Sequence, residues 1–197
     1  MPEERDIRIV TILGTVRPGS YTSKALALVI DELRRQEGVT VDLLDPGKLD
    51  LPLPGRGPSK DAERMRELVS NATGVVLATP EYHGGYSATI KLVIENLGFP
   101  SALAGKPVAL LGVAAGQIGA IKSLESLMSV CSHVGAIVLP GPVSIARVRQ
   151  VLGEDGSIED RKIEERIRSV AANLIRYIER HICPAIALES MVRGDGA

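Results

Sequence analysis

Short apolar runs alternate with amphipathic stripes along this chain, and this alternation constrains the fold more than any other feature. Apolar runs occupy residues 7–13, 75–78, 107–113 and 136–139, and residues 39–43 alternate between apolar and polar side chains. Each run is followed by apolar residues at helical spacing, within 26–33, 65–72, 87–97, 120–131 and 163–178. Strands that alternate with helices form parallel sheets covered on both faces, so an α/β fold is predicted.

The burial pattern of each run also predicts the order of the strands. The alternating run at 39–43 suits a sheet edge, whereas the first, third and fourth runs are apolar on both faces and suit central positions. The order 2-1-3-4-5 satisfies this pattern, which predicts a flavodoxin-like three-layer sandwich with a five-stranded parallel sheet. A six-stranded Rossmann sheet would need another strand that the sequence does not offer. We expect residues 1–197 to form one domain.

Composition excludes several classes of function. The 197 residues carry a net charge of −1 and only five aromatic side chains (four Tyr and one Phe), so neither phosphate neutralisation nor base stacking favours nucleic-acid binding. The charged start Met1–Asp6 and the lack of an apolar run of about 18 residues predict a cytoplasmic protein without a membrane span. Cys131 and Cys183 suggest neither a metal site nor a disulfide framework, and Cys131 continues a buried helical stripe.

Ligands of such sheets bind beyond the carboxyl ends of the strands, so the loops after Leu13, Thr79 and Val113 are expected to form the site. The first loop, residues 14–24, has the glycine spacing of a P-loop but Ser20-Tyr21 in place of its Lys and Ser/Thr. Its hydroxyls, the Arg17 guanidinium and a helix N-terminus suit a single phosphate monoester. A capped helix behind a hydroxyl-rich turn is the alternative.

The second loop, residues 79–87, holds two of the four tyrosines, a histidine and the pair Gly84-Gly85. Aromatic faces and closely approaching backbone suit a planar ligand, although a tight loop with surface tyrosines has the same composition. The third loop, residues 112–119, contains no ionisable side chain. Its small residues are compatible with a flat ligand edge and equally with packing of a helix on the sheet.

Together these loops resemble the NADPH-dependent FMN reductase family, which includes quinone, azo-dye and chromate reductases. The resemblance rests on Gly-Thr-x-Arg-x-x-Ser-x-Thr after the first strand and on Thr-Pro-Glu-Tyr-His after the third, and it covers roughly residues 7–180. It implies that the FMN phosphate is bound by Thr15, Arg17, Ser20, Tyr21 and Thr22. It implies ring contacts from Pro80, Glu81, Tyr82, His83 and Gly84, and pyrimidine-side contacts from Ala114, Ala115 and Gly116.

The resemblance implies an FMN-dependent NAD(P)H oxidoreductase that works in a ping-pong order. Hydride from NAD(P)H would pass to flavin N5 and then to a flavin, quinone, azo compound or similar small-molecule acceptor. The flavin supplies this chemistry, so no protein acid, base or metal is expected to be catalytic. Arg17 and Arg56 are candidates to meet the 2′-phosphate of NADPH. A homodimer or a dimer of dimers is also implied, and the apolar segment 182–188 is expected to cover a core edge or a partner subunit.

Two rival functions use the same sheet order. A flavodoxin-type electron carrier would bind FMN without nicotinamide activity, but such carriers are strongly acidic and this chain is nearly neutral. A phospho-receiver domain would need clustered carboxylates after the first strand and an Asp after the third, where this chain has Gly14-Thr15 and Pro80-Glu81. The reductase is therefore the preferred hypothesis.

Overall fold

The computed structural model describes residues 6–193, so the segment Met1–Arg5 of the predicted charged start lies outside the described residues. The strands are β1 (Ile7–Leu13), β2 (Val39–Leu44), β3 (Gly74–Tyr82), β4 (Gly85–Tyr86), β5 (Pro107–Val113), β6 (Ile137–Val138) and β7 (Val143–Ile145). The α-helices are α1 (Tyr21–Arg34), α2 (Lys60–Ser70), α3 (Ala88–Asn96), α4 (Ile121–His133), α5 (Val148–Val151), α6 (Arg161–Tyr177) and α7 (Cys183–Arg193). A 3-10 turn, η1 (Pro46–Lys48), precedes α2, and a π-helical segment, η2 (Ile178–Ile182), joins α6 to α7.

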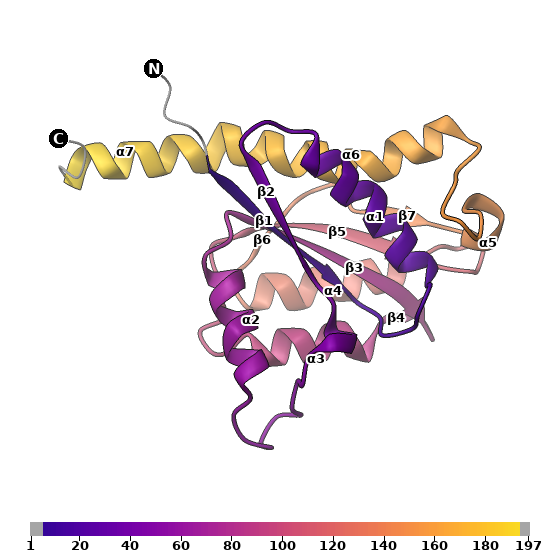
Figure 1. The fold of residues 1–197 in the computed structure, drawn as a ribbon, viewed down its shortest axis with the longest axis horizontal. Helices are drawn as coiled ribbons and strands as arrows, with labels where there is room; N and C mark the ends of the chain where they lie inside the picture. The colour runs from indigo at the N-terminus through magenta and orange to yellow at the C-terminus, as the bar shows by residue number, and fades with distance from the viewer. Residues whose placement is uncertain (1–5, 194–197) are drawn as a thin grey trace.

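The main strands follow the order β2-β1-β3-β5-β6 and pair in parallel, which confirms the predicted flavodoxin-like sheet (Figure 1). The fifth position differs in detail from the predicted strand at 136–139. Two short strands share it, because β6 pairs with the start of β5 and β7 pairs with its end. The segment Pro140-Gly141-Pro142 separates them, since proline has no N–H to donate to the sheet.

Successive strand residues face opposite sides of the sheet, and each side is covered by helices. Figure 1 shows α1 and α6 above the sheet and α2, α3 and α4 below it. Ile9, Val76 and Leu111 pack with the first pair of helices, whereas Ile12 and Leu77 pack with the second group. The double-sided burial of β1, β3 and β5 follows from this arrangement, as predicted for central strands. Cys131 is fully buried in the lower layer, where burial raises the pKa of its thiol to about 12.

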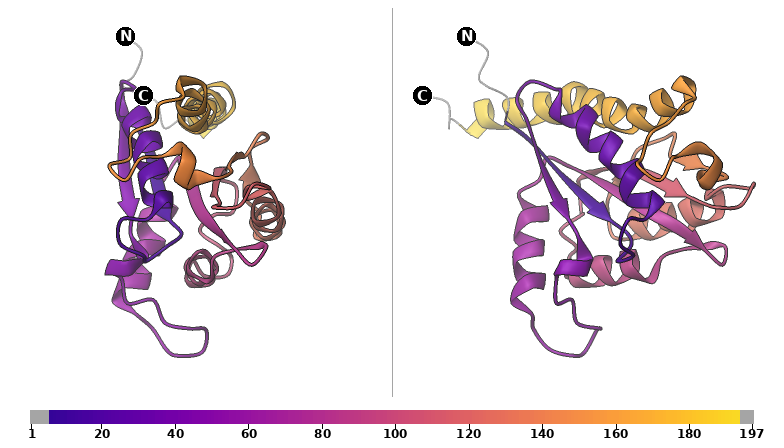
Figure 2. Two further views of the ribbon diagram at one scale, coloured as in Figure 1. Left: turned by 90° about the vertical axis from the view of Figure 1, so that its right-hand side faces the viewer. Right: turned by 45° about the vertical axis from the view of Figure 1, so that its right-hand side comes forward.

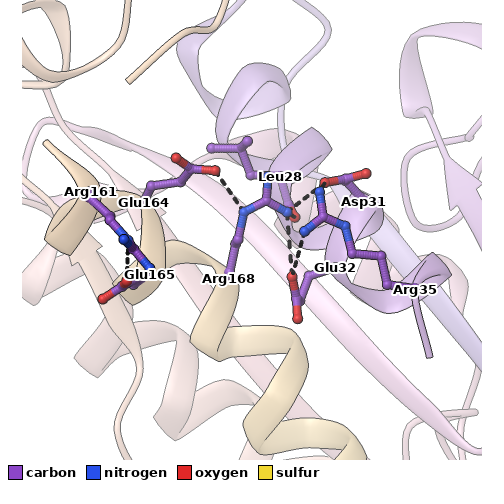
Figure 3. Close-up of polar contacts among 8 residues, drawn as sticks. All are labelled: Leu28, Asp31, Glu32, Arg35, Arg161, Glu164, Glu165 and Arg168. Carbon is purple, nitrogen blue, oxygen red and sulfur yellow. Dashed lines mark hydrogen bonds and ion pairs between the residues drawn. The ribbon is translucent and has the colours of Figure 1, made fainter. Parts of the chain in front are cut away.

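An arginine on α6 attaches that helix to α1, the helix that follows the first loop (Figure 3). Arg168 donates to the Asp31 carboxylate at 2.6 Å and to the Glu164 carboxylate at 2.8 Å, and its guanidinium lies 3.5 Å from Glu32. Its side chain is only 17% exposed, so these contacts are partly shielded from water. The hydrogen bond from Arg168 holds the pKa of Asp31 below its usual value. The α1–α6 contact therefore fixes the end of α1 that lies away from the first loop.

The C-terminal helices form one long rod, and the left view of Figure 2 looks nearly along it. Ile182 and Cys183 pack partly against the upper core, whereas Ile186 and Leu188 on α7 are 58% and 64% exposed. The expectation that segment 182–188 covers a core edge is thus wrong beyond Cys183, because α7 extends past the sheet (Figure 1). Coverage by a partner subunit stays a prediction. No helix within residues 6–193 is long and apolar enough to span a bilayer.

Candidate functional site

A cavity of about 690 Å³ opens at the carboxyl ends of β1, β3 and β5, where the parallel topology brings the three predicted loops together. Its size falls in the range of small-molecule and cofactor sites, which run from about 300 to 1,000 Å³. It is lined by residues of the three loops and of two further segments: Arg17, Pro18, Gly19, Ser20, Tyr21, Thr22, Lys24, Pro80, Glu81, Tyr82, Val113, Ala115, Val148, Arg149 and Glu154.

The first loop leaves β1 through a glycine that packs directly on the next strand. Gly14 N–H donates to the Ala78 carbonyl at 2.7 Å, and a Cβ at Gly14 would lie 2.4 Å from that oxygen. Only glycine fits this approach. The following Thr15 is buried, and its hydroxyl accepts from Arg17 N–H at 3.1 Å rather than lining the cavity. Thr15 therefore shapes the loop, while its role toward a phosphate stays a prediction.

The first loop ends at the N-terminus of α1. Gly19 has a positive φ of 62°, and Ser20 Oγ then accepts from Ser23 N–H at 3.1 Å as the helix cap. Tyr21 and Thr22 lie in the first turn, where backbone N–H groups have no carbonyl four residues earlier to bind. These donors, the helix dipole and Arg17 suit an anion at this end of the cavity.

The second loop is shorter than the predicted segment 79–87, because β3 continues through Tyr82 and the chain then turns back directly into β4. His83 and Gly84 have φ values of 52° and 78°, the pattern of a type I′ hairpin turn. The Glu81 carboxylate accepts from Gly84 N–H at 2.5 Å and closes the turn. Pro80, Glu81 and Tyr82 line the cavity, whereas His83 and Gly84 are exposed at the tip, outside its lining.

The tyrosines separate in the structure. Tyr82 lines the cavity and is 49% exposed, whereas Tyr86 packs partly buried against the lower core. Tyr21, from the first loop, supplies the other aromatic ring of the lining. The two aromatic rings that line the cavity therefore come from two different loops.

The third loop is held by the segment that follows β7. Ala114 is buried, and its N–H donates to the Ile145 carbonyl while its own carbonyl accepts from Val148 N–H. The Gly116 carbonyl accepts from Arg147 N–H at 3.0 Å. Of the three predicted residues of this loop, only Ala115 lines the cavity.

Sequence reasoning missed part of the cavity wall, namely Lys24, Val148, Arg149 and Glu154. Val148, Arg149 and Glu154 follow β7, in a stretch where the sequence predicted neither a strand nor a helix. Val143 and Ile145 are buried on either side of a half-buried serine, and this apolar–polar–apolar pattern was the signal for a strand. A strand there would have placed the next residues at the same carboxyl edge of the sheet.

A buried serine connects the first two loops. Ser87 caps α3 by accepting from Ile90 N–H at 3.1 Å, and its hydroxyl donates to the Gly14 carbonyl at 2.5 Å. Its N–H donates to Thr79 Oγ1 at 3.1 Å. One residue thus fixes the start of the first loop relative to the end of β3.

The cavity combines two chemically different ends. The first loop offers hydroxyls, a guanidinium and helix N–H groups, and the second and third loops offer Pro80, Tyr82 and Ala115. This donor set fits an elongated ligand with a phosphate at one end and a planar ring at the other, as FMN has. Within residues 6–193, no group of three His, Cys, Asp or Glu side chains is placed to hold a metal ion.

Comparison with known proteins agrees with this chemistry. Residues 7–150 match the family of NADPH-dependent FMN reductases. An NADPH azoreductase of Bacillus sp. (strain OY1-2) is 32% identical over 177 residues, covering 88% of this chain and 96% of the relative. An NAD(P)H-dependent FMN reductase of Pseudomonas aeruginosa is 28% identical over 181 residues, covering 89% and 97%.

Among solved structures, the flavoenzyme NAD(P)H:(acceptor) oxidoreductase FerB of Paracoccus denitrificans has a similar fold. The two superpose with a TM-score of 0.76 at 22% identity, over 89% of this chain and 98% of the other. At this level of identity the likeness concerns the fold alone.

Proposed function

Because the chain belongs to the NADPH-dependent FMN reductase family, we propose that it takes hydride from NADPH or NADH through FMN and delivers it to a small-molecule acceptor. The family consists of NAD(P)H-dependent oxidoreductases with FMN as cofactor. The proposal goes further in assigning a ping-pong order and a planar acceptor, such as a flavin, a quinone or an azo compound. The observation that supports it is a cavity lined both by the N-terminus of α1 and by Pro80 and Tyr82.

In this proposal the residues of the first loop hold the FMN phosphate. The hydroxyls of Ser20 and Thr22, the Arg17 guanidinium and the first-turn N–H groups of α1 provide neutral and charged donors around one position. Pro80 and Tyr82 contact the ring system, and Ala115 allows the backbone of the third loop to approach it. His83, Gly84 and Gly116, at the exposed rim, would contact the ring edge through backbone groups.

FMN supplies the hydride chemistry when it is bound, and the chain supplies position and access. Hydride transfer needs reacting atoms about 3 to 3.5 Å apart, so the donor and the acceptor must each stack closely on the ring. Tyr82 and Ala115 line the cavity and are exposed, and the hairpin tip and residues 116–118 that follow them are exposed as well. Two planar partners can therefore occupy the same face in turn, which is the structural requirement of a ping-pong order.

We also propose a homodimer or a dimer of dimers. Ile118 and Ile121 are 69% and 50% exposed at the third loop and the start of α4, beside the cavity rim. Large apolar side chains exposed next to a site are typical of an interface. Sedimentation at several protein concentrations, comparing the wild type with Ile121→Glu, tests this assembly.

Initial rates with FMN-loaded protein test the function. NADPH and a quinone are varied together, and the proposal predicts parallel double-reciprocal lines. Intersecting lines would contradict the ping-pong order but not the reductase activity. If neither nicotinamide nucleotide is oxidised with or without added FMN, the reductase proposal itself is wrong and an electron carrier is favoured.

A further inference from the structure

The cavity contains more positive charge than one flavin phosphate requires. Arg17, Lys24 and Arg149 all line it; Arg17 and Lys24 belong to the first loop and the first turns of α1, and Arg149 belongs to α5. The Lys24 ammonium lies 4.6 Å from the centroid of the Tyr21 ring. Hydrogen bonds from Ser157 lower the pKa of the Asp155 carboxyl, and the charge of Lys24 adds a smaller contribution in the same direction. Within residues 6–193, neither Arg17 nor Arg149 has a carboxylate within 4.0 Å of its guanidinium. Two arginines are thus available for ligand anions.

The inference rests on the proposed function, in which Arg17 and the N-terminus of α1 take the flavin phosphate. Arg149 lies elsewhere on the wall, on α5, which follows β7 rather than β1. FMN has one phosphate, so a second free guanidinium in the same cavity indicates a second anionic partner. The nicotinamide dinucleotide is the partner that must enter this cavity.

The backbone holds Arg149 in a defined place. Val148 N–H donates to the Ala114 carbonyl and Arg147 N–H donates to the Gly116 carbonyl, both at 3.0 Å. Arg147 adopts a left-handed φ of 47°, and its guanidinium donates to Gln117 Oε1. A non-glycine residue in this conformation costs energy that the surrounding contacts must offset, and such positions cluster at ligand sites. These bonds therefore attach the segment that precedes Arg149 to the third loop.

The cavity wall also contains an acidic side chain. Glu154 also lines the cavity, five residues after Arg149. In Rossmann-type dinucleotide sites an acid binds the ribose 2′-hydroxyl of NAD, whereas an arginine accommodates the 2′-phosphate of NADP, and the same chemistry applies to any site that binds these groups. The two side chains would therefore act in opposite directions on the choice of nucleotide.

We propose that Arg149 binds the 2′-phosphate of NADPH and that Glu154 opposes it, so that these two residues set the nucleotide preference. Arginine suits this role because its planar fork binds phosphate through two parallel hydrogen bonds. The proposal replaces the sequence-based candidates for the 2′-phosphate. Arg56 lies in the loop between η1 and α2, outside the cavity lining. Arg17 is assigned to the flavin phosphate in the proposed function.

The test compares FMN-loaded wild type with Arg149→Gln, Glu154→Gln and a matched control, Arg34→Gln. Arg34 is an exposed arginine in the last turn of α1, at the far end of that helix from the cavity. For Arg149→Gln, kcat/KM is expected to fall about tenfold or more with NADPH and less than about twofold with NADH, as for loss of a charged hydrogen-bond pair. Glu154→Gln should shift the NADPH/NADH ratio in the opposite direction, and Arg34→Gln should leave it unchanged.

Calorimetric titration gives a readout that does not depend on turnover. Arg149→Gln should weaken binding of 2′-phospho-ADP-ribose about tenfold and leave ADP-ribose unaffected. Equal weakening of both ligands would place Arg149 at the pyrophosphate, and no change in either would remove it from the nucleotide site; each result overturns the proposal. A wild type that oxidises neither nucleotide refutes the proposed function, while the titrations still decide the role of Arg149.

Discussion

Replacement of Ser87 by alanine tests whether one buried hydroxyl holds the first two loops together. The Ser87 side chain makes two hydrogen bonds in a residue that is 2% exposed, one to the Gly14 carbonyl and one from Ile90 N–H. Loss of a serine N-cap costs about 1 kcal/mol. The buried Gly14 carbonyl left without its donor costs about 1–3 kcal/mol more. We therefore expect Ser87→Ala to lower the free energy of unfolding by about 2–4 kcal/mol.

Ser59→Ala is the matched control. Ser59 caps α2 in the same way, because its hydroxyl accepts from Ala62 N–H and donates to the Asp50 carbonyl. Its bond to Asp50 is solvent-exposed, so the expected cost is about 0.5–1 kcal/mol. Ser59 also lies outside the lining of the cavity, so FMN binding should not change.

Urea denaturation measures the two unfolding free energies, and quenching of FMN fluorescence measures cofactor affinity. At about 2–4 °C per kcal/mol for a chain of this size, Ser87→Ala should lower the melting temperature by about 4–16 °C. It should also weaken FMN binding about tenfold, equivalent to about 1.4 kcal/mol of lost loop order. The reasoning is refuted if the two variants are destabilised equally, or if Ser87→Ala binds FMN as tightly as the wild type.

Three further predictions concern the framework around the site. Arg168→Met should lower the free energy of unfolding by about 1–3 kcal/mol at neutral pH, because it breaks a partly shielded charge network. Asp31 has a lowered pKa in the folded protein, so its contribution is present above the unfolded pKa of about 4 and disappears as the pH falls through the lowered value. The wild type should therefore lose more stability than Arg168→Met between pH 7 and pH 3 in urea titrations, and equal losses would contradict this. Gly112→Ala should cost about 1–3 kcal/mol in the same assay, because the new methyl group would lie 2.6 Å from the Ala120 methyl group and 2.8 Å from the Leu124 side chain of α4; a neutral effect would show that α4 can move away. Iodoacetamide at pH 8 should label Cys183, which is partly exposed, and spare the buried Cys131 until the protein unfolds, as mass spectrometry of the peptides can show.

The sequence predicted the sheet well because its central strands have an unambiguous pattern. Val75–Ala78 is a short apolar run that begins with two β-branched residues, which favours a strand covered on both sides. The parallel order then placed three loops at one edge without any knowledge of side-chain contacts. Eight of the thirteen predicted cofactor residues line the cavity for this reason: Arg17, Ser20, Tyr21, Thr22, Pro80, Glu81, Tyr82 and Ala115.

The hairpin after β3 was less predictable, because proline normally argues against a strand interior. Pro80 is nevertheless part of β3, paired with Val113 of β5. On its other side, β1 ends at Leu13, opposite Ala78, so Pro80 does not need to donate an N–H toward that strand. Strand length therefore depended on where a neighbouring strand ended, which local sequence does not encode.

The wall formed by Val148, Arg149 and Glu154 was missed for a related reason. The apolar–polar–apolar pattern after Pro140-Gly141-Pro142 is only three residues long, and α5 is only four residues long, so each signal is short. The position of α5 depends on hydrogen bonds to the third loop, between residues about 30 positions apart. Contacts of that kind become visible only in the structure.

Anaerobic titration of the FMN-loaded protein decides whether the chain passes hydride from a nicotinamide nucleotide through FMN. We expect NADPH to bleach the visible flavin absorption in the absence of any acceptor, and a quinone added afterwards to restore it. This two-stage result would show that the nucleotide and the acceptor react in turn with the same flavin. A flavin spectrum that neither NADPH nor NADH bleaches would contradict the account.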